Sequence, residues 1–146
     1  MKTIISLIAA ALISAATSAQ SDIGAILKNY LLVKDALVQS DNVQAAKQAA
    51  ALAKDLEQAG ELKGKEIMLK TAQKISKTPD IEKQRLIFAE LSPALWAAVK
   101  DEKSVDQNVY YQYCPMKKSY WLSADSAIRN PYYGNKMLTC GRLSWR

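Results

Sequence analysis

Apolar residues recur about every 3.6 residues through most of residues 22–102, and this spacing predicts amphipathic helices. Capping and turn residues divide the pattern into four stretches. We expect helices at residues 22–40, from after residue 42 to residue 59, around the interrupting Gly64, and from residues 78–80 onward. Short connections between four such helices favour an antiparallel four-helix bundle. The predicted core positions are Ile23, Ile26, Leu27, Tyr30, Leu31 and Leu37; Val43, Ala46, Ala50, Ala53 and Leu56; Met68, Ala72 and Ile75; Phe88, Leu91, Leu95 and Val99.

Residues that cap or interrupt helices set the predicted helix ends. Ser21 or Asp22 is suited to cap the first helix, and Gly60 suits the residue just past the second. Pro79 fits the first turn of the fourth helix. Pro93 lies inside that helix, where a proline can introduce a kink.

Residues 108–146 have a different composition, with six of the seven tyrosines, two of the three tryptophans and both cysteines. Residues 109–114, 120–122 and 140–145 are typical of short strands, and Asn-Pro and Gly-Asn pairs indicate turns between them. A polar connector, residues 101–108, precedes this part. The chain is therefore expected to be mainly α, with residues 22–102 as the bundle and residues 108–146 as a small, aromatic-rich β/irregular subdomain. These aromatics fit either the core of that small sheet or a recognition surface.

The N-terminus has the order of a secretory signal peptide: Lys2, an uncharged apolar run at residues 3–16, and small residues before Ala19. We expect cleavage after Ala19, leaving residues 20–146 as one exported domain. The apolar run is shorter than the roughly 20 residues that a membrane-spanning helix needs. No second run reaches that length, so no membrane insertion is expected after cleavage.

The composition excludes several kinds of function. The chain has no histidine, which excludes imidazole-based catalysis and metal sites built on histidine. It contains no Cys-x-x-Cys pair and no recognisable carboxylate pair, so we expect no enzyme activity. The net charge of +6 is read as a solvated lysine-rich surface, because no nucleic-acid-binding signature accompanies it.

The most informative feature is a set of four sulfur-containing residues. Cys114 stands two residues before Met116, and Met137 stands three residues before Cys140. Thiolate and thioether are soft ligands that favour Cu(I), and the same chemistry suits Ag(I). Aromatic side chains nearby can shield such an ion or contact it through their faces, namely Tyr113, Tyr120 and Trp121.

A disulfide between Cys114 and Cys140 is the alternative, because an even pair of cysteines in an exported protein is commonly oxidised. Closing that loop contributes roughly 3 kcal/mol of stability. Met116 and Met137 would then be packing residues. The protein would in this case be a structural or interaction module that docks on another envelope protein.

Several short blocks in the second part resemble an uncharacterised bacterial domain family of unknown function: residues 113–116, 120–123, 128–134 and 137–141. Residues 81–95 resemble the last helix of that family. Members occur alone behind signal peptides or fused to periplasmic adaptor subunits of copper/silver-type efflux pumps. The chain departs from the family in a short, basic segment at residues 117–120 and in lacking the histidine that some relatives carry in the last helix.

The resemblance implies a periplasmic location and a role in heavy-metal handling, with a possible adaptor subunit as partner. Carried over by motif, the ligands are Cys114, Met116, Met137 and Cys140, surrounded by Tyr113 and Trp121. The sequence therefore predicts a Cu(I)- or Ag(I)-binding protein for sequestration or delivery, with the disulfide-linked module as its rival.

Overall fold

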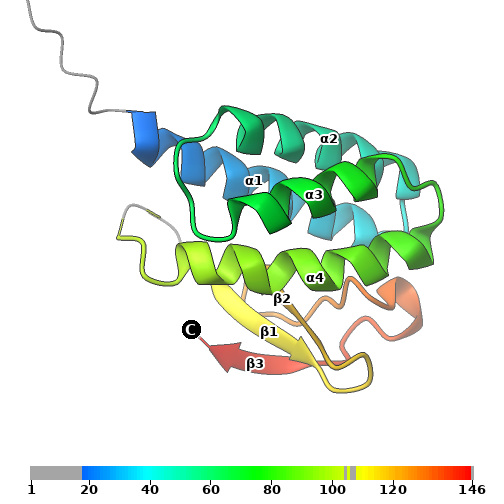
Figure 1. Cartoon of the computed structure of the whole chain (residues 1–146). Coiled ribbons are helices and arrows are strands. Elements are labelled where there is room, and N and C mark those ends of the chain that lie inside the picture. The colour runs from blue at the N-terminus through cyan, green and yellow to red at the C-terminus, as the bar shows by residue number, and fades with distance from the viewer. Residues whose placement is uncertain (1–17, 104, 106–107, 146) are drawn as a thin grey trace, which may run out of the picture.

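The structure, a computed structural model, describes residues 18–103, 105 and 108–145. Four helices come first: α1 Ser18–Val38, α2 Asn42–Gln58, α3 Lys65–Ser76 and α4 Ile81–Val99 (Figure 1). The strands β1 Tyr110–Cys114, β2 Ser119–Ser123 and β3 Arg142–Trp145 follow, with the short 3-10 helix η1 Gly134–Lys136 before β3. The protein is therefore mainly helical with a small C-terminal antiparallel sheet, as the sequence predicts.

The predicted signal peptide falls almost entirely outside the described residues, apart from Ser18 and Ala19, which begin α1. The helix thus starts earlier than the predicted cap at residues 21–22. Within the described part of the chain, no helix combines the length and apolar character needed to cross a membrane.

Aspartate side chains fix the starts of two helices. Asp41 accepts a hydrogen bond from the Gln44 backbone N–H at 2.9 Å, and Asp80 does the same for Lys83. Both satisfy an N–H that the first helical turn leaves without a partner. Pro79 therefore precedes the capping residue instead of occupying the first helical position. The extended backbone of Ala59 ends α2. Gly60, the next residue, does not adopt a left-handed backbone conformation.

Three helices bury the side that the sequence predicts, whereas α2 does not. Val43 is 71% exposed, and Ala46 and Ala50 also lie outside the core. The buried residues of α2 are Ala45, Ala49, Leu52, Ala53 and Leu56, so the prediction is confirmed only for Ala53 and Leu56. Alanine occupies so many positions of this helix that its apolar spacing fits more than one side, and packing against α1 and α3 selects between them.

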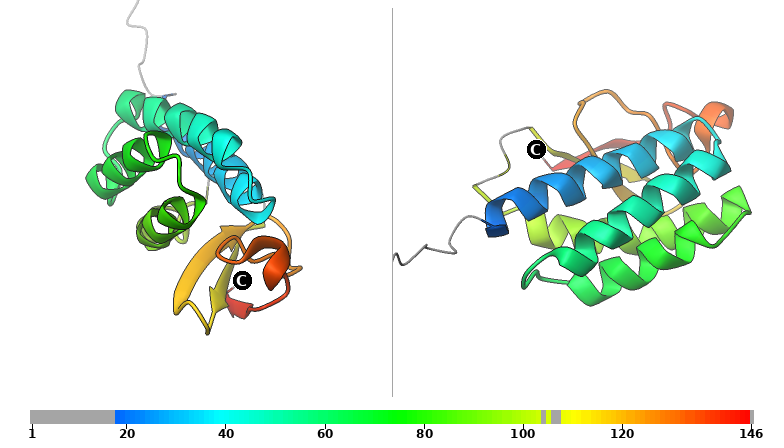
Figure 2. Two further views of the ribbon diagram at one scale, coloured as in Figure 1. Left: turned by 90° about the vertical axis from the view of Figure 1, so that its right-hand side faces the viewer. Right: turned by 90° about the horizontal axis from the view of Figure 1, so that it is seen from above.

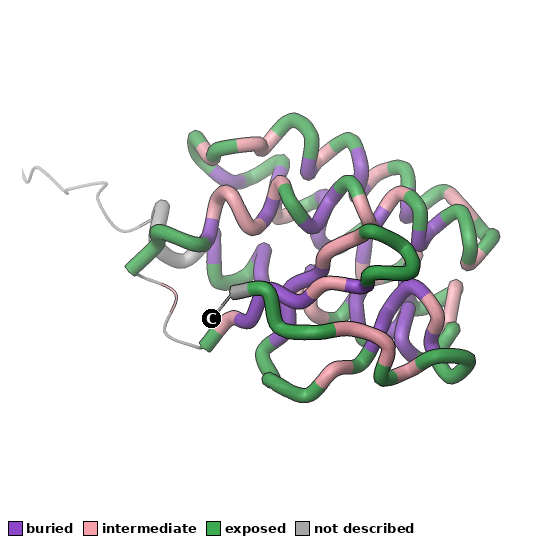
Figure 3. The backbone as a smooth tube through the Cα atoms, turned by 90° about the horizontal axis from the view of Figure 1, so that it is seen from below, coloured by how far each residue is buried: buried purple, intermediate pink, exposed green. Residues whose placement is uncertain are grey.

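Consecutive helices lie side by side, α1 against α2, α2 against α3 and α3 against α4 (Figure 2). The sheet packs on the side of this layer formed by α4 and α1. Buried positions recur along the helices and gather where the sheet meets them (Figure 3). The two parts of the chain thus share one continuous core.

The sheet has the order β2-β1-β3 and is antiparallel throughout. Cys114, the last residue of β1, pairs with Ser119, the first residue of β2. A register shift between Tyr111 and Gln112 adds an irregularity to the pairing of β1 with β3. The four residues between β1 and β2 form a tight turn that projects from the sheet.

Tyr30 joins the helices to the sheet. It is fully buried and stacks on Phe88 with ring centroids 4.9 Å apart. Its hydroxyl lies 2.7 Å from Ser92 Oγ and accepts a hydrogen bond from the Leu122 backbone N–H at 3.0 Å. Burial raises the pKa of Tyr30 well above its ordinary value, so the hydroxyl stays neutral. One side chain thereby connects α1, α4 and the edge strand β2.

Candidate functional site

The first half of the sulfur set lies at the end of β1. Cys114 is buried, and the chain turns immediately after it through residues 115–118. Lys118 adopts a left-handed conformation (φ 50°) that lets β2 return alongside β1. Within the turn, the Lys117 backbone N–H donates a hydrogen bond to Cys114 Sγ at 3.4 Å.

Asn130 positions the second half, the segment that carries Cys140. Its side chain is fully buried and donates to the Cys140 carbonyl at 2.6 Å while accepting from the Tyr132 N–H at 2.8 Å. Its backbone N–H donates to the Leu138 carbonyl at 2.7 Å. These hydrogen bonds close the loop of residues 130–140 onto itself.

Gly141 allows this loop to approach the sheet closely. Its φ is 157°, and a Cβ added there would lie 2.7 Å from Trp121 Cη2 and 3.1 Å from the Tyr113 carbonyl oxygen. Any larger residue would push the backbone away from the sheet. The absence of a side chain at this position therefore brings the neighbouring Cys140 against Cys114.

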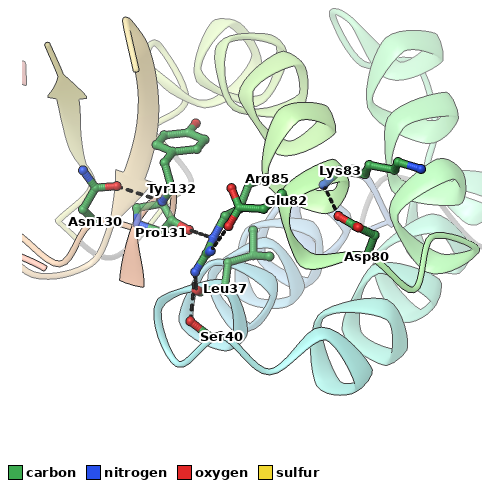
Figure 4. A network of polar contacts seen from close by, with 9 residues as sticks. All are labelled: Leu37, Ser40, Asp80, Glu82, Lys83, Arg85, Asn130, Pro131 and Tyr132. Carbon is green, nitrogen blue, oxygen red and sulfur yellow. Dashed lines mark hydrogen bonds and ion pairs between the residues drawn. The ribbon is translucent and has the colours of Figure 1, made fainter. Parts of the chain in front are cut away.

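Arg85 anchors the same loop to the helices (Figure 4). Its side chain is 6% exposed and donates to the Pro131 carbonyl at 2.8 Å and to the Leu37 carbonyl at 2.9 Å. It also reaches Ser40 Oγ at 3.0 Å and Glu82 at 2.7 Å. One guanidinium thus ties α4, the end of α1 and the C-terminal loop together, which positions the loop that carries Cys140.

The two cysteine sulfur atoms lie 3.9 Å apart, and both are free thiols. This separation exceeds the roughly 2.05 Å of a disulfide bond. It is close to the ~3.8 Å expected between two sulfurs on one tetrahedral metal with metal–sulfur bonds of about 2.3 Å. The structure therefore brings together the two cysteines that the sequence singles out.

Burial raises the pKa of the Cys140 thiol above its ordinary value. Cys114 raises the pKa further, by hydrogen bonding and by the repulsion between two thiolates, while the backbone of Met116 acts in the opposite direction. Without a bound cation, Cys140 consequently holds its proton to higher pH than an isolated cysteine does.

The methionines are near the cysteines in the chain, and both are open to solvent. The side chain of Met116, in the turn after β1, is 63% exposed, and that of Met137 is 39% exposed. The Cys140 backbone N–H donates to the Met137 carbonyl at 3.1 Å, which fixes the backbone spacing of that segment. Among the described residues, no three or more carboxylates, cysteines or histidines gather in one place.

The aromatic residues expected around the sulfurs lie on different faces of the sheet. Trp121 is two residues from Ser119, the partner of Cys114, and so shares the cysteine face. Tyr113 and Tyr120 belong to the opposite face, where their ring centroids are 4.6 Å apart. Tyr113 also lies under the guanidinium of Arg142, at 5.5 Å. Only Trp121 of the three is placed to shield an ion at the thiols.

Sequence reasoning did not find two residues that shape this site, Arg85 and Asn130. Asn130 belongs to a predicted turn and Arg85 to a predicted helix, and neither pattern indicates a role at the site. Each acts through partners distant in the sequence or through backbone atoms, and a residue pattern carries little information about either. Full burial of a polar side chain is the signal that identifies them, and it requires the fold.

The fold and the thiol pair define a mainly helical protein with two adjacent cysteines at its small C-terminal sheet. Residues 26–107 match the family described as Protein of unknown function (DUF3347), and because this match spans more than half of the chain, the protein belongs to that family. The expected membership in a family of unknown function is thus confirmed. The matched residues end before β1, so both cysteines lie outside them. Neither the comparison with curated proteins nor that with solved structures gives a match.

Proposed function

We propose that this protein binds Cu(I) or Ag(I) in the periplasm through Cys114 and Cys140, and sequesters the ion or delivers it to a heavy-metal efflux system. The observation that carries the proposal is the 3.9 Å separation of two free sulfurs from segments 26 residues apart. Thiolate and thioether together are soft ligands and favour Cu(I) over Zn²⁺, Mg²⁺ or Ca²⁺. A site with sulfur donors and no histidine suits a soft monovalent cation best.

Electrostatics support the same proposal. The pKa of the Cys140 thiol is raised by burial and by its neighbour, so the pair resists holding two negative charges. A cation between the sulfurs removes that repulsion and replaces the protons. Metal affinity is therefore expected to rise with pH while protons compete for the thiols.

The methionines would complete the coordination. Met116 and Met137 lie between the two cysteines in the chain, each close to one of them. Their exposed side chains are free to turn toward a bound ion. Thioether ligands bind Cu(I) well, so the full ligand set is Cys114, Met116, Met137 and Cys140.

The predicted signal peptide and the family resemblance supply the cellular setting. Export would place the site in the periplasm, and an adaptor subunit of a copper/silver-type efflux pump would be its partner. In this proposal the helices form an antiparallel four-helix bundle that acts as a scaffold, and all metal chemistry takes place in the C-terminal subdomain.

The test is a competitive Cu(I) titration of the reduced, anaerobic protein without residues 1–19, against a chelator of known affinity. We expect one tightly bound ion, which is lost in the Cys114→Ser/Cys140→Ser variant. Met116→Leu/Met137→Leu should weaken binding, whereas Met68→Leu, a buried methionine in α3, should leave it unchanged. Unchanged affinity in the double-serine variant would refute the proposal.

A second candidate is the disulfide-linked interaction module. Cys114 is fully buried, and the two sulfurs need to approach by only about 2 Å to reach bonding distance. An aromatic hollow of ≈ 390 Å³ between α4 and the sheet offers a docking place, lined by Trp96, Lys100, Asp101, Tyr111, Tyr120 and Ser144. This candidate predicts no free thiol in the exported protein and no effect of Cu(I) on its melting temperature.

A further inference from the structure

The positive charge of the chain is concentrated in one part of it. Residues 20–109 contain 13 lysines and arginines and 13 aspartates and glutamates, so this segment is formally neutral. Residues 110–146 contain six basic residues and one acidic residue. The excess of basic over acidic residues therefore belongs almost entirely to the C-terminal subdomain. A lysine-rich surface spread over the whole protein does not describe it completely.

The cations of this subdomain are available for an external partner. Lys117, Lys118, Arg129, Lys136 and Arg142 are all exposed. The ion pairs found among the described residues involve other basic side chains. Uncompensated like charges in one region produce a positive potential that attracts anionic groups.

The fold gathers three of these cations at the end of the sheet that carries the thiol pair. The turn at residues 115–118, η1 and the start of β3 lie at this same end (Figure 1). The ammonium of Lys117 lies 4.9 Å from the ring centre of Tyr133, which directly precedes η1. Lys118 in the turn and Lys136 in η1 complete the set. Arg142 is not one of them, because it pairs with Tyr113 and its guanidinium lies over that ring on the opposite face.

Exposed apolar side chains accompany these charges. Met116 and Met137 stand next to Lys117 and Lys136 in the chain, and the exposed Leu143 follows Arg142. Protein interfaces combine apolar contacts with charges in this way. A membrane-surface site, in contrast, is commonly one amphipathic helix with a basic face. Here the cations come from a turn and a 3-10 helix.

We infer that this surface, the basic thiol face (Met116, Lys117, Lys118, Lys136 and Met137), docks an acidic polypeptide surface and holds it beside Cys114 and Cys140. The inference deepens the proposed function by giving the chemistry of the partner that supplies or receives the metal ion. Complementary charge steers such a partner and orients it, while the exposed thioethers lie at the contact. Docking itself requires no bound metal.

The experiment measures binding of a short oligo-glutamate peptide by titration, using the metal-free Cys114→Ser/Cys140→Ser protein so that the result does not depend on metal binding. On that background, Lys117→Glu/Lys118→Glu reverses two charges of the basic thiol face. Lys47→Glu/Lys54→Glu makes the same change in net charge at exposed positions of α2 and is the matched control. A parallel titration uses anionic phosphatidylglycerol vesicles.

We expect the turn variant to bind the peptide at least about tenfold more weakly and the α2 variant to bind it like the parent. Raising the salt from about 20 to about 200 mM should also weaken binding, because it shortens the screening length severalfold. Equal weakening by both variants would overturn the inference, since it would mean that only net charge matters. Binding to vesicles but not to peptide would overturn it in favour of a lipid surface. If the protein with both cysteines intact binds no Cu(I) in the competition titration, the proposed function is refuted and this docking result stands.

Discussion

Replacing Tyr30 by phenylalanine tests whether one hydroxyl holds the sheet against the helices. Ser92 Oγ donates to the Phe88 carbonyl at 3.0 Å, so its proton is already used. The Tyr30 hydroxyl therefore donates to Ser92 Oγ and accepts from the Leu122 N–H. Tyr30→Phe removes both interactions and leaves the stacking on Phe88 in place.

The free-energy cost of Tyr30→Phe comes from the hydrogen-bonding group that loses its partner. The Leu122 N–H lies in a buried part of β2 and would have no acceptor, which costs about 1–3 kcal/mol. Ser92 keeps its bond to the Phe88 carbonyl and adds little to the cost. A loss of about 2 kcal/mol corresponds to a fall of roughly 6–10 °C in melting temperature for a domain of this size.

Urea unfolding followed by circular dichroism gives the free energy of unfolding. Tyr113→Phe is the control, because Tyr113 is half-buried at the sheet surface and its ring contacts do not need the hydroxyl. We expect the control to change stability by less than about 0.5 kcal/mol. Equal effects of the two substitutions would refute the assigned role of Tyr30.

Three further outcomes are expected. Gly141→Ala should destabilise the protein by about 1–3 kcal/mol in thermal denaturation, because its Cβ would meet Trp121 at 2.7 Å, and an unchanged melting temperature would contradict the close approach. Arg85→Lys should cost about 1–3 kcal/mol in urea unfolding, since an ammonium cannot reach the separate carbonyls that the guanidinium contacts, and a neutral effect would contradict the anchoring role. Burial raises the pKa of Tyr111 to about 12, so the unfolded chain releases this proton first and stability should fall as the pH rises from about 10 to 12. Tyr111→Phe should make that fall shallower, and an unchanged slope in alkaline urea titrations would contradict the assignment.

Much of the fold follows from local sequence signals. The strands are predicted to within a residue or two, because aromatic and β-branched runs between turn residues permit few alternatives. Three helices bury the predicted residues, since their large apolar side chains recur with a single period. In α2 the many alanines permit several periods, so Val43 is assigned to the core although it is exposed. Only contact with the neighbouring helices determines which side of α2 is buried.

The sequence singles out the residues of the candidate site, but it does not show how the fold brings them together. Cysteine and methionine carry their ligand properties wherever they lie, so the residues themselves pointed to Cys114 and Cys140. The closeness of the two sulfurs depends on Gly141, Asn130 and Arg85, which act through backbone atoms and distant partners. Proximity in sequence does not by itself place a side chain at the thiols. Tyr113 is adjacent to Cys114 but belongs to the opposite face of the sheet.

The central claim is that Cys114 and Cys140 together bind a soft metal ion. X-ray absorption at the copper edge of the Cu(I)-loaded protein, after removal of unbound copper, tests it most directly. The account expects one retained ion per chain, surrounded only by sulfur, with no copper retained by the Cys114→Ser/Cys140→Ser variant. Oxygen or nitrogen donors at the copper, or equal retention by that variant, would contradict the claim.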